Sequence, residues 1–315
     1  MKTALKEAAE FITRIGQTRL SDDRLTPIAK DKLFSLRQNG YVVFDHFVGS
    51  QEFASLRDWV SSTYEDRLEF RTPCLAQHHI DESRDADLIE RNFNVKMREL
   101  QARNLVFHAK DVQSYSQVLR DFAPSTLTLD MPSRKPFYDL WLDDTVTSVI
   151  SAYMGFRPIM REAFIRRNFP CNYAVMNHKW HRDTNHRRHL LKAFIFFTDC
   201  NIETGAHHYV PGSIGAHCFK ESRYFEDHEV DEVFPPEKGK QMISTVSAGT
   251  IILEDTRGLH KAGIPKRDFR DLGFAVFVPP SFLHCDKPHY TVSAETYSSL
   301  TANQQAFIPN RYVSQ

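Results

Sequence analysis

The pattern of apolar and polar residues changes near residue 155. Before that point the apolar residues recur at helical spacing. Steps of three and four residues separate them in several stretches, the period that gives a helix one apolar face. Gly40 and Gly155 follow two of these stretches as stop signals, and Ser50 and either Asp143 or Asp144 precede two others as caps. The sequence predicts helices over 3–15, about 27–39, 50–64, 110–122 and 143–153.

From residue 157 onward the pattern becomes a series of short β-rich segments separated by turn residues. Glu203-Thr-Gly205, Pro211-Gly-Ser213 and Ala248-Gly249 mark three of the turns. The predicted strands cover 158–168, 172–178, 190–198, 206–210, 241–246, 250–254 and 272–278, and an earlier one covers 41–48. Several short strands after a mainly helical half favour a double-sheet β-fold flanked by helices.

We expect one domain over 1–315, with a helical part to about 155, a β-rich core over about 156–280 and a tail over 281–315. Residues 70–108 show little periodicity and predict a long irregular excursion. Proline residues 124, 132 and 136 predict a break before the last helix of the first part, and the tail predicts one helix near 293–306.

Charge and cysteine usage exclude several classes of protein. The formal net charge is zero, which argues against a nucleic-acid-binding protein. The five cysteines are dispersed without CxxC spacing, as in proteins of a reducing cytosol. Glu7 and Glu10 interrupt the first apolar stretch, so we expect no signal peptide there, and no apolar run is long enough to span a membrane. A cytoplasmic enzyme is therefore expected, with peripheral membrane contact left open.

Three His-x-Asp pairs stand out as candidate metal ligands, because alternate residues of a strand point to the same side. With 15 histidines, about one such pair is expected by chance, so spacing alone has little value. The pair at 79 and 81 lies in the irregular region, and the pair at 284 and 286 leaves little chain for a distant third ligand. His181 and Asp183 are followed by several strands and then by His260, which completes two imidazoles and a carboxylate.

Other residues near this constellation are open to two interpretations. Arg270 opens a strand ten residues after His260, where its guanidinium can pair with a distant carboxylate of a bound acid. Alone it would be interpreted as a surface residue. Competing ligands are His186 and His189, in a charged loop-like run, and His207 and His208, of which at most one can face a core.

Basic residues gather on either side of the His-x-Asp pair. The segment 161–192 holds eight basic and two acidic residues in a chain that is otherwise balanced. This excess predicts an anionic substrate drawn in by a positive field, with Arg182, Arg187 and Arg188 as candidate contacts. The alternative is a solvated loop whose arginines pair with acidic residues elsewhere.

The sequence resembles the phytanoyl-CoA dioxygenase family of Fe(II)/2-oxoglutarate oxygenases. The resemblance rests on NGYVVFDHFV, WHRD, ETGAHHYVPGS, AGTIILED with its following histidine, and FRDLGFAVFV, and it extends from about residue 34 to 278. It implies a double-stranded β-helix, or jelly roll, with iron held by His181, Asp183 and His260 and 2-oxoglutarate by Arg270. Ala262 departs from the family, which often has a small hydroxyl residue there.

The resemblance also implies an activity, which is hydroxylation with 2-oxoglutarate and O2. Related halogenases have a small residue in place of the carboxylate, so Asp183 favours a hydroxyl product. Lys192 resembles a basic position of relatives that modify glycans and is a candidate second contact for 2-oxoglutarate. An acidic sugar of lipopolysaccharide or another surface glycan would suit the charge; a fatty acyl-CoA and a secondary metabolite are the alternatives. A zinc hydrolase and a non-catalytic cupin-like binding module are the rival classes.

Overall fold

The computed structural model describes residues 24–65, 120, 125–174, 176–183, 190–280 and 288–314. Its α-helices are α2 (Pro27–Asn39), α3 (Gln51–Glu65), α7 (Lys135–Trp141), α8 (Asp144–Met154), α9 (Asp227–Val233), α10 (Ala294–Ser299) and α11 (Ala302–Gln305). Its strands are β1 (Tyr41–Phe44), β2 (Thr126–Asp130), β3 (Ile159–Asn168), β4 (Leu191–Phe196), β5 (His208–Tyr209), β6 (Met242–Ile243), β7 (Ile251–Glu254), β8 (His260–Lys261), β9 (Arg270–Val278), β10 (Val292–Ser293) and β11 (Val313–Ser314).

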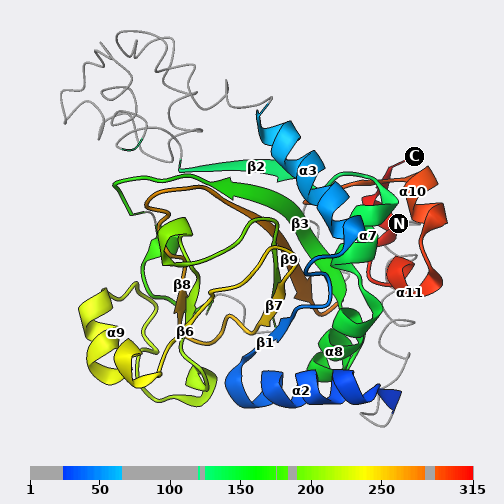
Figure 1. The fold of residues 1–315 in the computed structure, drawn as a ribbon. Helices are drawn as coiled ribbons and strands as arrows, with labels where there is room; N and C mark the ends of the chain where they lie inside the picture. The colour runs from blue at the N-terminus through cyan, green and yellow to red at the C-terminus, as the bar shows by residue number, and fades with distance from the viewer. Residues whose placement is uncertain are drawn as a thin grey trace, which may run out of the picture.

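Two antiparallel sheets form the centre of the fold. The large sheet has six strands in the order β1-β7-β4-β9-β3-β2, and the small sheet has three in the order β6-β5-β8. His207, just before β5, packs its ring 4.9 Å from the ring of Phe194 on β4, which brings the small sheet against the large one. Helices α2, α3, α7 and α8 lie along the large sheet, whereas β6 and β8 lie with α9 at the other end (Figure 1).

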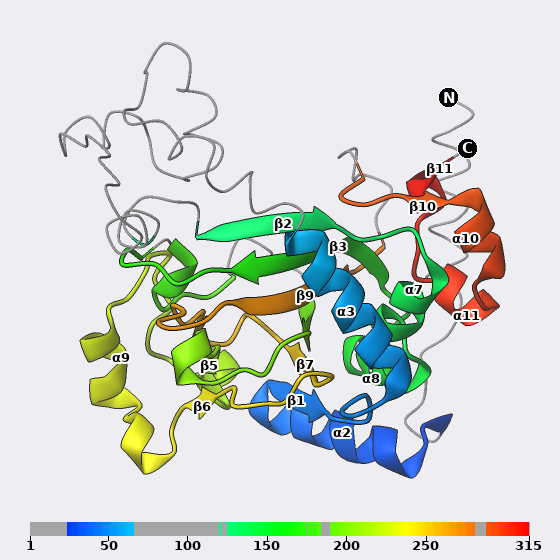
Figure 2. The same ribbon diagram turned by 45° about the horizontal axis from the view of Figure 1, so that its top comes forward.

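The face of the large sheet that meets the helices carries the main apolar core. Alternate residues of β3, β4 and β9, among them Ile165, Ile195 and Phe277, are fully buried there with side chains of α7 and α8. Trp141 of α7 lies over Gly273 of β9, where an added Cβ would come within 2.6 Å of the indole ring. Figure 2 shows the helices α3, α7 and α8 stacked along this side of the sheet.

The opposite face of the large sheet points toward the small sheet, and we call it the inner face. It consists of the intervening residues of the same strands, since side chains alternate along a strand. Phe164 of β3 stacks on Phe274 of β9 with ring centroids 4.7 Å apart, and Phe194 meets Phe274 edge-on at 5.4 Å. The charged members of the inner face include Lys192, Arg166, Arg270, Glu162 and Glu254.

The helices predicted from caps and stop signals are confirmed wherever the structure describes them. Thr26 caps α2 and Gly40 ends it with φ 84°, a left-handed conformation that glycine adopts without strain. The Ser50 hydroxyl accepts from Phe53 N at the start of α3, and Asp143 and Gly155 bound α8. The predicted helix over 3–15 and the irregular excursion over 70–108 lie outside the described residues, as does nearly all of 110–122.

Other predictions were wrong in detail. Residues 176–178 form a 3-10 helix within the segment predicted as a strand over 172–178, and none of the described residues of that segment pairs in a sheet. The single helix predicted near 293–306 is two, because Leu300 leaves the helical conformation and Thr301 caps α11. Strand β2 and helix α7 occupy the region where prolines predicted a break, and Pro136 lies in the first turn of α7 where its missing N–H costs nothing.

The fold is a mainly β double-stranded β-helix with flanking helices, as expected. Strands β1 and β2 come from the part predicted as helical, and both join the large sheet as its two edges. The predicted division into one domain with three parts stays a prediction. Among the described residues, none of the helices combines the length and the apolar character needed to cross a bilayer.

Candidate metal centre

Two distant parts of the chain meet where the small sheet faces the large one. His181 and His260 form an antiparallel bridge, with His181 N donating to His260 O at 2.9 Å and His260 N donating to His181 O at 3.0 Å. Asp183 N donates to Thr256 O at 2.9 Å, which extends the pairing by two residues. One ligand atom from each of His181, Asp183 and His260 lies within 4.8 Å of the others, so the structure brings together the triad predicted from the sequence.

Each histidine of the triad is oriented by its own backbone. His181 Nδ1 lies 2.8 Å from Lys179 O, and His260 Nδ1 lies 3.0 Å from Gly258 O. A carbonyl oxygen only accepts hydrogen bonds, so each Nδ1 must carry the proton. The lone pair of each imidazole is therefore on Nε2, which is the form that binds a metal. Burial lowers the pKa of His260 to about 3, so its imidazole is neutral at physiological pH.

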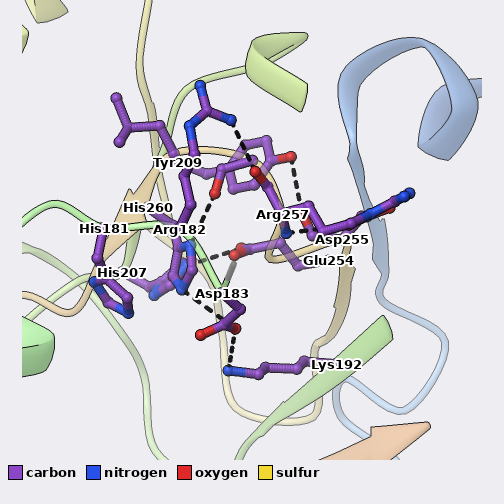
Figure 3. Close-up of polar contacts among 12 residues, drawn as sticks. His181, Arg182, Asp183, Lys192, His207, Tyr209, Glu254, Asp255, Arg257 and His260 are labelled. Carbon is purple, nitrogen blue, oxygen red and sulfur yellow. Dashed lines mark hydrogen bonds and ion pairs between the residues drawn. The ribbon is translucent and has the colours of Figure 1, made fainter. Parts of the chain in front are cut away.

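The carboxylate of Asp183 is held by a lysine of the large sheet. Lys192 Nζ lies 2.5 Å from Asp183 Oδ2 and 5.4 Å from the centroid of the Phe274 ring (Figure 3). Burial alone would raise the pKa of Asp183, but the positive charge of Lys192 outweighs it and brings the pKa to about 2. Asp183 is therefore ionised at physiological pH, as a metal ligand must be.

A buried pair that the sequence did not single out lies beside the triad. His207 Nε2 lies 2.8 Å from Glu254 Oε2, and the His207 ring centroid is 5.7 Å from that of His260. Burial raises the pKa of Glu254 to about 8 and lowers that of His207 to about 3, so the pair is neutral and Glu254 donates its proton. An acidic residue ending the apolar run of β7 was the available signal in the sequence.

Arg270 points from β9 into this region and is almost fully buried, with 3% of its surface exposed. Within the described part of the chain, its Nε and Nη1 atoms are buried and make no hydrogen bond. A buried cation without a counter-charge is costly to fold, because each N–H loses its hydrogen bonds to water. The arrangement therefore fits an anionic ligand that supplies acceptors to Arg270.

The predicted substrate contacts differ in what the structure shows of them. Arg182 is turned away from the triad and donates to three backbone carbonyls, those of Phe219, Arg257 and Cys218 (Figure 3). Arg187 and Arg188 lie outside the described residues, as do the competing ligands His186 and His189. His208 is half-buried on the edge of Trp180, and of the two adjacent histidines His207 is the one that faces the large sheet.

The residues present fit a divalent transition metal together with a dicarboxylate. Two imidazoles that present Nε2 and one ionised carboxylate on one side of a metal leave the other side for further ligands. In the described chain, Asp183 Oδ2 lies 2.5 Å from Lys192 Nζ and 3.9 Å from His260 Nε2, and Arg270 has unsatisfied donors. The Asp183 oxygen suits a metal, and the free donors of Arg270 suit the distal carboxylate of an acid that chelates that metal.

Comparison with known protein families gives one match. The model of the phytanoyl-CoA dioxygenase family matches residues 36–264, which include all three residues of the triad. A comparison with curated protein sequences finds no match.

Comparison with solved structures finds distant likenesses to oxygenases. EctD from S. alaskensis, with 2-oxoglutarate and 5-hydroxyectoine, is 17% identical, with 87% of this chain and 86% of that one covered and a TM-score of 0.48. HygX from Streptomyces hygroscopicus, with nickel and 2-oxoglutarate, is 16% identical, with 81% and 87% covered and a TM-score of 0.45. The epimerase SnoN from nogalamycin biosynthesis is 14% identical, with 80% of both chains covered and a TM-score of 0.45.

Proposed function

Because the chain belongs to the phytanoyl-CoA dioxygenase family, we propose that it is an Fe(II)- and 2-oxoglutarate-dependent hydroxylase of a small anionic substrate. His181, Asp183 and His260 hold the iron. The observation that carries the proposal is the convergence of these three ligand atoms within 4.8 Å beside a buried arginine with unsatisfied donors. Three such ligands alone would suit several metal-dependent reactions. The buried arginine beside them also requires an anionic ligand, such as a carboxylic acid.

The chain's own residues prepare the metal ligands. The carbonyls of Lys179 and Gly258 orient the rings of His181 and His260 so that each presents Nε2. Lys192 keeps Asp183 ionised and lies against its Oδ2, which holds the carboxylate beside the two imidazoles. The intact carboxylate of Asp183 fills a coordination place and so favours hydroxylation over halogenation.

Arg270 takes the far carboxylate of 2-oxoglutarate in this proposal. A guanidinium offers two parallel N–H donors to the two oxygens of a carboxylate, and burial strengthens the pairing. Lys192 is the proposed second contact of 2-oxoglutarate, since its ammonium lies between the Asp183 carboxylate and the Phe274 ring. When bound, iron and 2-oxoglutarate use O2 to insert one oxygen atom into a substrate C–H bond, with succinate and CO2 released.

The inner face surrounds this chemistry with apolar rings. Phe164, Phe194 and Phe274 pack together beside Lys192 and Arg270. These rings keep water away from the reacting atoms, which strengthens the charged contacts around them. Glu254 and His207 are both neutral, so neither adds a charge that would compete with the contacts of the bound acid.

An acidic sugar of lipopolysaccharide or of another surface glycan is the substrate class that we propose first. The positive charge of Arg270 and its neighbours on the inner face supports an anion, and a fatty acyl-CoA or an acidic secondary metabolite meets the same requirement. We propose a cytoplasmic enzyme, acting at the cytosolic face of a membrane where the glycan is lipid-linked.

Anaerobic titration tests the proposal. Fe(II) and 2-oxoglutarate added to the protein should together produce a weak visible charge-transfer band, because both must chelate at one site. H181A and H260A should lose the band, and the control H208A, one residue from His207 but outside the triad, should keep it. R270Q should raise the Kd of 2-oxoglutarate by about 30-fold or more, as expected for removing one partner of a buried charge pair.

The rival classes give different results in the same titration. A zinc hydrolase would bind the metal without producing the band on addition of 2-oxoglutarate, and a binding module would produce no succinate with any substrate. A wild-type protein that binds Fe(II) without developing the band would overturn the proposal.

A further inference from the structure

We infer that Arg166 of β3 binds a carboxylate of the substrate and thereby sets the specificity of the enzyme. The inference rests on the proposed function, because it concerns the same site. Arg166 lies two residues after Phe164 on the inner face and pairs across the sheet with Leu272 of β9. Arg270 lies two residues before Leu272, so Arg166 and Arg270 are diagonal neighbours on that face.

The basic segment 161–192 contains several cations that the fold itself uses. Arg167 pairs with Asp271 through two bonds of 2.7 Å, Lys179 pairs with Glu226 at 2.5 Å, and Lys192 pairs with Asp183 at 2.5 Å. Arg182 donates to backbone carbonyls. Four of the eight basic residues of this segment are therefore paired with carboxylates or with backbone carbonyls of the protein.

Arg166 is different. Its Nε atom is buried and makes no hydrogen bond, and no carboxylate of the described chain lies within ion-pair distance of its guanidinium. Its guanidinium carbon lies 5.1 Å from the centroid of the Phe164 ring, which in turn stacks on Phe274. Burial lowers the pKa of Arg166, with partial compensation from Tyr64 and Glu162. A partly buried cation with a buried, unused N–H donor suits a ligand carboxylate.

Arg166 and Arg270 act on the same surroundings. The pKa of His178 is lowered to about 4, first by burial and then by the positive charges of Arg270, Lys261 and Arg166. The charges of both arginines therefore act on His178, three residues before His181. Diagonal neighbours in an antiparallel sheet are about 7–8 Å apart, which leaves room for two separate carboxylates.

The charges of the site do not fully compensate Arg166 when the cofactors are bound. Arg270 takes the far carboxylate of 2-oxoglutarate, Lys192 is balanced by Asp183, and Glu254 is neutral because burial raises its pKa to about 8. Arg166 then has no ion pair within the described chain, and Glu162 on the same strand offsets its charge only in part. A carboxylate of the substrate supplies the counter-charge and accepts from Nε and a terminal N–H together. A neutral substrate would leave the cation unpaired at a cost of several-fold in affinity.

The experiment compares acids with their neutral esters on one set of variants. Free 3-deoxyoctulosonate and N-acetylneuraminate, each with its methyl ester, are titrated calorimetrically into the anaerobic Fe(II)·2-oxoglutarate enzyme. The proteins are wild type, R166Q, R166K and the control R161Q, which removes an arginine from the far end of the same strand. Thermal melting and the Kd of 2-oxoglutarate are measured on each variant.

We expect the wild type and R161Q to bind at least one acid about tenfold or more tightly than its ester. R166Q should bind the acid and the ester equally, with the melting temperature and the Kd of 2-oxoglutarate unchanged, and R166K should recover part of the preference. Equal binding of acid and ester by the wild type would overturn the inference. So would an R166Q variant that keeps the preference but binds 2-oxoglutarate more weakly, since Arg166 would then belong to the cofactor.

Failure of the proposed function would look different. In that case the wild type would show no 2-oxoglutarate-dependent band before any sugar acid is added, and both proposals would fall together. Retention of the band with loss of the acid preference in R166Q separates the role of Arg166 from that of the metal site.

Discussion

Lys192 Nζ lies 2.5 Å from Asp183 Oδ2, so a cation of the large sheet holds the carboxylate of the proposed metal site. The contact joins β4 to the segment that carries the His-x-Asp pair. Lys192 also lies opposite Glu254 in the register of β4 and β7. The lysine can therefore act on the metal site in two opposite ways, as a support for Asp183 or as a competitor for it.

We predict that K192M weakens Fe(II) binding by about tenfold, because residues that orient a metal ligand typically contribute 10–100-fold to metal affinity. Methionine keeps the length of the side chain and removes the charge. K192R is the control that keeps the charge. Anaerobic Fe(II) titration measures the effect, and tighter binding by K192M would show that Lys192 competes with the metal for Asp183.

The second prediction concerns the ion pair on the other face of the large sheet. Arg167 and Asp271 each expose 3% of their side chains. R167M leaves the Asp271 carboxylate buried without its partner and should lower the free energy of unfolding by about 3–5 kcal/mol. The double variant R167M/D271N should recover part of the loss. R57M, which breaks an exposed pair with Asp58, is the control.

Urea denaturation measures both variants. We expect R57M to change the free energy of unfolding by under about 1 kcal/mol, because an exposed ion pair contributes little. Equal effects of R167M and R57M would contradict the importance given to the buried pair.

The third prediction uses the close contact between Gly258 and Tyr209. A Cβ at Gly258 would lie 1.9 Å from Tyr209 Oη and 2.3 Å from Cζ, and the Tyr209 hydroxyl donates to Asp255 O. G258A must displace the ring, and we expect a loss of about 1–3 kcal/mol in stability with weaker Fe(II) binding at His260 nearby. Gly215 has nothing within 4 Å of an added Cβ, so G215A is the matched control. Identical melting curves for the two variants would refute the prediction.

The fourth prediction concerns pH. Asp143 Oδ1 accepts from Thr145 N and Val146 N at 3.0 Å each and lies 3.5 Å from His46 Nε2. Burial alone would raise the pKa of Asp143, but His46 and these N–H groups bring it below the ordinary 3.8. A carboxyl group with a lowered pKa in the folded state stabilises the protein above its unfolded pKa and loses that contribution as the pH falls.

D143N keeps a capping oxygen and removes the charge. We expect it to lower the unfolding free energy by about 0.3–1 kcal/mol at pH 6, with the difference from wild type shrinking as the pH falls below about 3.8. Urea denaturation at a series of pH values measures this difference. A gap that stays constant from pH 6 to pH 3 would show that the charge has no role.

The sequence was informative where local chemistry decides the structure. Helix α8 was predicted with its cap at Asp143 or Asp144 and its stop at Gly155, because capping and stop residues act on the backbone next to them; the cap is Asp143. The long strands β3 and β9 were predicted almost to their ends, since their apolar runs are flanked by turn residues. The metal triad was predicted from spacing and order, and its convergence follows from the pairing of His181 with His260.

What the sequence left out depends on contacts between distant segments. The segment around Asn177 has a β-rich composition. In the structure, Asn177 O accepts a hydrogen bond from Ala262 N, and residues 176–178 form a 3-10 helix rather than a strand. Arg182 stood beside two proposed ligands, yet strand alternation turns it to the opposite side. The pairing of Glu254 with His207 and the lack of an ion pair for Arg166 in the described chain could not be predicted either, because the interior of the fold decides which charges are compensated.

The way in which His181 and His260 are oriented has a consequence for the choice of metal. Since neighbouring carbonyls of the main chain set both rings, the cost of arranging them is met when the polypeptide folds. Loading an ion then demands little rearrangement, and other first-row ions such as Mn²⁺, Co²⁺ or Ni²⁺ should also bind, with affinities that follow the usual divalent order. Such a protein leaves selection of its metal to the supply available in the cell.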